Sequence, residues 1–130
     1  MATWKQVRDY VESNYKYDYD EEGDFFKLIF DVGDDRTQVV FIQRLKNQKG
    51  TSWVEVSSPI GEIDKADIFD FLEELEETVC GGAIKRGDYI FIRNAILLDS
   101  IDSDSLDSAL ARIASIADDL ENKYVGGDDN

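Results

Sequence analysis

The chain has 130 residues, of which 42% are hydrophobic and 12% are aromatic, so the sequence predicts one globular domain with a sizeable core. Its 14 basic and 29 acidic residues give a formal net charge of −15. A field of that sign repels nucleic-acid phosphates and anionic membranes, so we expect neither as a partner. The same acidity favours solubility and would attract basic partners.

The cysteine and the N-terminus bear on the compartment. Because Cys80 is the one cysteine of the chain, it cannot form an internal disulfide, which fits a reducing compartment. The first residues lack the apolar run of a signal peptide, and no uncharged segment approaches the length of a membrane span. We therefore expect a cytoplasmic protein.

The first half of the chain predicts one helix and three strands. Thr3-Trp4-Lys5-Gln6 matches a capping box, which would begin a helix with Trp4, Val7 and Val11 on its apolar side. Residues 14–23 form a polar connection. Alternating apolar residues then predict strands over 25–32, 37–45 and 53–57. Short turns at 33–36 and 47–50 make these strands an antiparallel meander.

The second half predicts a helix, a hairpin and a long helix. Asp64 is the expected cap of the first, whose apolar stripe is Ile68, Phe71, Leu72, Leu75 and Val79 and which stops at Gly81-Gly82. A hairpin with Arg86-Gly87 at its turn joins strands over 82–85 and 88–98. Ser103, Asp104 and Ser105 are candidate N-caps for the last helix. Its apolar stripe is Leu106, Leu110, Ile113, Ala117, Leu120 and Tyr124.

The elements together define the expected fold class. The order α-β-β-β-α-β-β-α predicts an α+β domain built on an antiparallel sheet. We expect residues 1–125 to form this single domain and residues 126–130, after Gly126, to form a frayed acidic tail.

This order resembles the type III secretion chaperone-like fold, and within it the sequence is similar to the YbjN family of bacterial sensory-transduction regulators. The resemblance runs from Trp4 to about Tyr124 and is most specific from Ile68 to Glu121. It rests on patterns of residue class, in Phe69-Asp70-Phe71-Leu72-Glu73-Glu74-Leu75, in Tyr89 to Leu98 and in the acidic helix from Leu106. The resemblance implies a homodimer that holds a partner polypeptide, or a regulator that acts through protein contacts. The chain departs from the family in its higher acidity.

The sequence offers no catalytic constellation, so we expect neither an enzyme nor a cofactor. Without any histidine, Cys80 lacks its usual base, and most zinc chemistry is excluded. Asp18–Asp24 superficially resembles a calcium loop, but Ile29 stands where the bidentate glutamate belongs. Among Asp99, Asp102, Asp104 and Asp107, helix capping and placement at a helix N-terminus explain Asp104 and Asp107. The alternative function, a small-molecule or divalent-metal-binding domain that uses clustered carboxylates, rests on these two segments.

The sheet carries the strongest functional signal. If one face packs on the first and last helices, the other face carries large apolar side chains and needs a cover, because a sheet face open to water is normally polar. The cover is either the helix that starts at Ile68 or a second polypeptide, and we expect both to contribute. The candidate partner-binding or dimer residues are Phe25, Ile29, Trp53, Ile68, Phe71, Tyr89 and Phe91. The sequence thus predicts a non-enzymatic, homodimeric protein-binding module, chaperone-like or regulatory.

Overall fold

The computed structural model describes residues 3–78 and 81–125. Within them, three α-helices and six strands form an α+β fold. The helices are α1 (Trp4–Asn14), α2 (Ile68–Glu77) and α3 (Ser103–Tyr124), with 3₁₀ turns at Lys65–Asp67 and Leu98–Ser100. The strands are β1 (Asp18–Asp20), β2 (Phe25–Gly33), β3 (Arg36–Lys46), β4 (Ser52–Gly61), β5 (Gly82–Arg86) and β6 (Tyr89–Leu97). The expectations for Val79, Cys80 and the tail at 126–130 lie outside the described residues.

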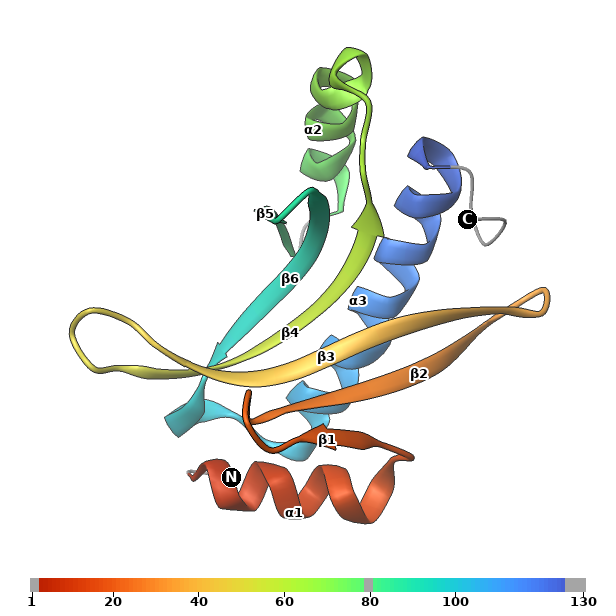
Figure 1. Ribbon diagram of the computed structural model, residues 1–130. Coiled ribbons are helices and arrows are strands. Elements are labelled where there is room, and N and C mark those ends of the chain that lie inside the picture. The colour runs from red at the N-terminus through yellow and green to blue at the C-terminus, as the bar shows by residue number, and fades with distance from the viewer. Residues whose placement is uncertain (1–2, 79–80, 126–130) are drawn as a thin grey trace.

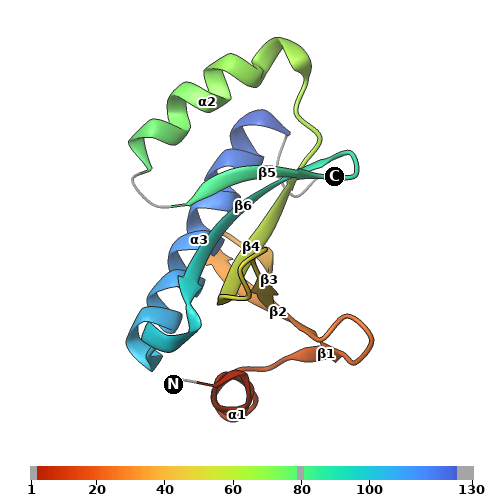
Figure 2. The same cartoon turned by 90° about the vertical axis from the view of Figure 1, so that its left-hand side faces the viewer.

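All six strands belong to one antiparallel sheet in the order β1-β2-β3-β4-β6-β5. Figure 1 looks onto one face of this sheet, and α3 runs behind it. Helix α1 lies along one end of the sheet beside β1, and α2 lies beyond the opposite end. The view turned by 90° shows α2 on the same side of the sheet as α3 (Figure 2).

The core lies between the sheet and α3, and the alternation of apolar residues puts it there. In β2, Phe26 and Leu28 are buried, and in α3 the predicted stripe from Leu106 to Leu120 is buried. The capping box of α1 is also confirmed, because Thr3 accepts from the Gln6 amide and the Gln6 side chain accepts from the Thr3 amide. Trp4, Val7 and Val11 of α1 close the core at its end.

The element boundaries differ from the expectation at four places. The connection after α1 contains β1, held by Tyr19, whose ring packs 4.9 Å from that of Phe26. Strand β4 continues through Pro59 to Gly61, where a bulge shifts its register with β6. The hairpin turn is residues 87–88, since Arg86 pairs with Tyr89. The N-cap of α3 is Asp102, one residue before the expected candidates, because its side chain accepts from the Ser105 amide.

Two tyrosines fasten α1 to α3 through one carboxylate. The hydroxyls of Tyr10 and Tyr15 donate to Asp107 at 2.7 and 2.5 Å. Burial, and then the hydrogen bond to Asp107, raise the pKa of Tyr15 well above its usual value. A tyrosine pKa that is higher in the folded state contributes stability below about pH 10, and this contribution is lost as the pH rises further.

Replacing Asp107 by asparagine should therefore destabilise the fold and change its alkaline behaviour. We expect Asp107→Asn to lower the free energy of unfolding by about 1 to 2 kcal/mol at neutral pH, because Tyr15 loses a charged acceptor. The decline of stability above pH 10 should become shallower. Urea unfolding at a series of pH values measures both effects. Asp119→Asn, an exposed change on the same helix, is the control, and equal behaviour of the two variants would contradict the assignment.

Candidate functional site

The face of the sheet opposite the core, here called the outer face, is defined by the strand register. Residues that pair directly across antiparallel strands share a face, so the pairs Lys27↔Phe41, Phe41↔Ser57 and Ser57↔Arg93 run across it from β2 to β6. It comprises Asp18, Asp20, Phe25, Lys27, Ile29, Asp31, Thr37, Val39, Phe41, Gln43, Leu45, Trp53, Glu55, Ser57, Pro59, Gly82, Ile84, Arg86, Tyr89, Phe91, Arg93, Ala95 and Leu97. In the described part of the chain no helix lies over this face, which is turned toward the viewer in Figure 1.

An aromatic row crosses the outer face. The ring of Phe41 lies between those of Phe25 and Phe91, with centroid separations of 5.7 and 6.5 Å. Ile29 beside this row is 62% exposed. A sheet face left in water normally carries polar side chains, and aromatic residues are enriched where proteins bind each other. The row therefore has the character of an interface.

A buried carboxylate next to the row holds two arginines. Glu55 is fully buried, and its oxygens accept from Arg86 at 2.9 and 3.0 Å and from Arg93 at 2.9 Å. Gln43 donates to the same carboxylate at 3.3 Å. The guanidinium of Arg86 also lies 5.7 Å from the centre of the Phe91 ring. Glu55 thus holds both guanidinium groups on the outer face, where about two fifths of each arginine side chain stays exposed.

These arginines make the part of the outer face around Glu55 locally positive. There Arg86 and Arg93 outnumber Glu55, while Asp18, Asp20 and Asp31 lie on the same face toward β1 and the β2–β3 turn, and the chain carries a net charge of −15. The local positive charge and the partly exposed aromatic rings together favour an acidic, partly apolar polypeptide as the ligand of this region.

Helix α2 packs on α3 and leaves the outer face open, so the expectation that it partly covers that face is wrong. The ring of Phe71 stands at 90° to that of Tyr124, with centroids 5.5 Å apart, and Lys123 binds Glu74 at 2.6 Å. Leu75 packs against the core on the same side. Phe71 and Leu75 of the stripe that the sequence assigned to the sheet thus face α3 and the core, because α2 follows an extension of β4 beyond the sheet. Leu72 of the same predicted stripe is 49% exposed.

The opposite side of α2 is exposed, apolar and acidic. Phe69 is 80% exposed and Leu72 is 49% exposed. The exposed Glu73 and Glu76 follow on the same side of the helix, at the three- and four-residue spacing that places side chains together. We call this set (Phe69, Leu72, Glu73, Glu76) the α2 ridge.

The structure places the predicted site residues in three regions. Phe25, Ile29, Trp53 and Phe91 lie on the outer face, as expected. Tyr89 lies on the same face, at the end of the β5–β6 hairpin, and is 51% exposed. Ile68 is half-buried at the start of α2. Phe71 is 1% exposed in the core, so its expected contact with a partner is corrected: the Tyr124 ring already occupies its surface.

The sequence interpretation missed the charged part of the site. The sequence did not decide which face of the sheet Phe41 occupies, and Glu55, Arg86 and Arg93 were not recognised as site residues. One signal was present, because Glu55 stands between the buried Val54 and Val56, and a carboxylate enclosed by a core strand needs cationic partners. Its partners Arg86 and Arg93 lie on β5 and β6, and only the strand register of the folded sheet brings them next to Glu55.

In the two acidic segments considered for metal binding, the carboxylates of Asp24, Asp102 and Asp107 already bind neighbouring protein groups. The Asp24 carboxylate accepts from the Tyr19 hydroxyl and from Trp4 Nε1, and Arg44 lies 3.7 Å away. Burial by itself would raise the pKa of Asp24, but the two hydrogen bonds together with the charges of Arg44 and Arg8 lower the pKa. Asp102 caps α3, and Asp107 binds the two tyrosines. Within residues 3–78 and 81–125, no group of three or more acidic or cysteine side chains is arranged to hold a metal ion.

Comparison with known proteins gives no family for this chain. No protein-family model matches it, and no curated protein resembles it closely enough to count as a relative. Among the described residues, none of the helices combines the length and apolarity that crossing a membrane requires.

Proposed function

We propose that this chain is a non-enzymatic protein-binding module that forms a homodimer, with the α2 ridge of each copy bound on the outer face of the other. The observation that carries the proposal is the match between the two surfaces. The outer face offers aromatic rings beside Arg86 and Arg93, and the α2 ridge offers Phe69 and Leu72 beside Glu73 and Glu76.

Symmetry strengthens this pairing. Every copy carries both surfaces, so a two-fold dimer makes the contact twice and leaves neither surface open. Strands β2, β3, β4 and β6 have nine to eleven residues each. At about 3.3 Å per residue and about 4.8 Å between strands, their outer face covers on the order of 600 Å². That area approaches the roughly 800 Å² per partner that a stable interface buries.

The proposal agrees with the resemblance to the YbjN family and the type III secretion chaperone-like fold, which implies a homodimer that acts through protein contacts. A chaperone-like or regulatory role follows if a partner polypeptide with an acidic amphipathic helix competes with the α2 ridge for the outer face. The fixed arginine pair would then select acidic partners over the basic ones that the net charge attracts.

A charge reversal on the α2 ridge tests the dimer. We expect Glu73→Lys with Glu76→Lys to weaken dimerisation by more than about tenfold in sedimentation velocity, because the new lysines meet Arg86 and Arg93. The control is Asp9→Lys with Glu12→Lys on the exposed side of α1, which changes the net charge equally. Lower net charge alone favours association, so weaker association of the α2 variant is diagnostic. A monomeric wild-type protein, or equal effects of the two variants, would contradict the proposal.

A further inference from the structure

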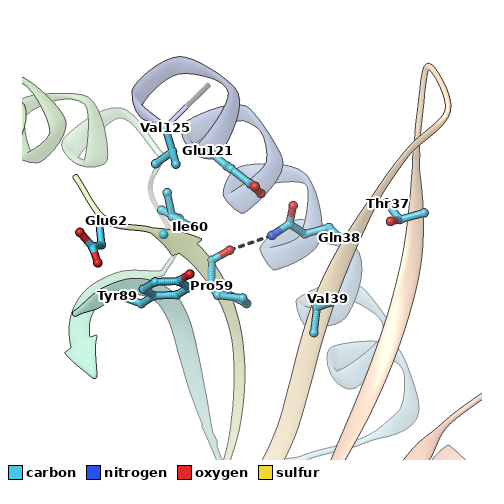
Figure 3. A pocket seen from close by; sticks show the side chains of 10 residues that line it. Thr37, Gln38, Val39, Pro59, Ile60, Glu62, Tyr89, Glu121 and Val125 are labelled. Atoms are coloured by element: carbon cyan, nitrogen blue, oxygen red, sulfur yellow. Dashed lines mark hydrogen bonds between the residues drawn. The ribbon is translucent and has the colours of Figure 1, made fainter. Parts of the chain in front are cut away.

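A pocket opens where β3 and β4 separate. The last pair of their ladder toward this end is Phe41↔Ser57, and beyond it the Gln38 side chain bridges the two strands. Its Nε2 donates to Ser58 Oγ and to the Pro59 carbonyl, both at 2.9 Å. Between the separated strands and the end of α3 lies a cavity of about 410 Å³ (Figure 3). The volume is in the range of small-ligand sites.

The orientation of the Gln38 amide is fixed by its neighbours. The Pro59 carbonyl only accepts, so the nitrogen of the amide must face it. Ser58 Oγ donates to the Val39 carbonyl at 2.5 Å and therefore also accepts from this nitrogen. The Oε1 atom consequently points away from both strands, toward the cavity and the Glu121 side chain (Figure 3).

Gln38 Oε1 is an unsatisfied acceptor. Gln38 is 3% exposed, and its Oε1 accepts no hydrogen bond from the residues that the structure describes. A buried carbonyl without a donor is unfavourable, so a ligand that supplies a donor is stabilised there. The pocket therefore has a defined polar anchor at its inner wall.

The rest of the lining sets the charge and polarity of the ligand. Glu121 and Glu62 contribute carboxylates, and the Tyr89 ring lies opposite Gln38. Ile60 and Val125 add apolar surface, and no lysine or arginine lines the cavity within the described residues. An acceptor, two carboxylates and an aromatic ring suit a cation that donates hydrogen bonds.

We propose that this pocket binds a primary ammonium group carried on an aliphatic chain. An ammonium has three donors and no acceptor, so one of its N–H groups satisfies Gln38 Oε1, and the neighbouring Glu121 carboxylate supplies the opposite charge. Its methylene groups pack on Ile60 and Val125. Such a group comes from a free polyamine or from a lysine side chain, and the two sources share this chemistry.

An NMR titration of the ¹⁵N-labelled full chain at physiological salt tests the site. The probes are cadaverine, N-acetyl-lysine amide as the lysine side chain, and 1,5-pentanediol as the uncharged analogue of cadaverine. We expect both ammonium probes, or cadaverine alone if the source is a polyamine, to shift the Gln38 side-chain amide and the backbone amides of Ile60 and Tyr89. Pentanediol should leave these signals in place.

Two variants of equal net charge make the test specific. Glu121→Gln removes the carboxylate beside Gln38 and should weaken cadaverine binding at least about tenfold, the loss expected for one charge-assisted hydrogen bond. Glu22→Gln, in the exposed turn between β1 and β2 away from the pocket, should leave the affinity unchanged. Equal binding of pentanediol, equal loss in both variants, or shifts spread over the acidic surface without Gln38 would overturn the proposal.

Discussion

Replacing Phe41 by glutamate should convert the proposed dimer into a monomer that keeps its fold. Phe41 stands in the middle of the aromatic row, with Phe25 and Phe91 on either side. In the proposed dimer the α2 ridge covers this ring, so a carboxylate there would lose its water and would also meet Glu73 and Glu76. We expect the dissociation constant to rise by more than about a hundredfold, the size of effect seen at the centre of an interface.

The monomer should tolerate this change because the outer face is open to water when the second copy is absent. The expected cost to folding is about 1 kcal/mol, from the lost aromatic contacts. Sedimentation velocity gives the association, and circular dichroism gives the fold. Phe41→Tyr is the control, since it keeps the ring and should keep the dimer. A folded Phe41→Glu variant that still dimerises would exclude the outer face as the interface.

Replacing both arginines of the buried cluster by methionine should cost the fold about 3 kcal/mol. Methionine keeps Glu55 covered by apolar side chains but removes both positive charges, and a covered carboxylate without a counter-charge is strongly destabilising. The variant is Arg86→Met with Arg93→Met, measured by urea unfolding at neutral pH. Glu55 is completely buried, which makes the loss larger than at an ordinary surface ion pair.

Replacing Glu55 should destabilise the fold less than replacing its two arginine partners. Glu55→Gln leaves two arginines that remain about two fifths exposed and keep much of their water, so we expect a loss of about 1 kcal/mol. Lys46→Met with Lys49→Met, two exposed lysines, is the control for the change in net charge and should have little effect. A larger loss of stability in Glu55→Gln than in the Arg86→Met, Arg93→Met variant would contradict this account. It would mean that the two arginines need Glu55 more than the buried carboxylate needs the arginines.

Local patterns in the sequence predicted most of the fold. The capping box at Thr3 and Gln6, the alternation from Phe26 through β2 and the stripe of α3 each depend on neighbours within a few residues, and all three are confirmed. Strand β1 was missed because its three residues are polar or aromatic in a polar connection, and only the packing of Tyr19 on Phe26 reveals it.

The candidate site depends on long-range geometry that the sequence does not display. Glu55 meets Arg86 and Arg93 across 31 and 38 residues of chain, and the registers of two separate ladders bring them together. The apolar stripe of α2 was recognised, but a stripe does not say which surface it covers. Phe71 and Leu75 pack against the α3 side of the molecule, so Phe69 and Leu72 are left exposed.

The most direct test of the proposed dimer is an isotope-filtered NOE experiment on a mixture of ¹³C-labelled and unlabelled protein, which detects contacts between copies only. We predict cross-peaks from the Phe69 ring and the Leu72 methyl groups of one copy to the Phe41 and Phe91 rings of the other. A dimer that gives intermolecular cross-peaks elsewhere, and none between these residues, would contradict the pairing of the α2 ridge with the outer face.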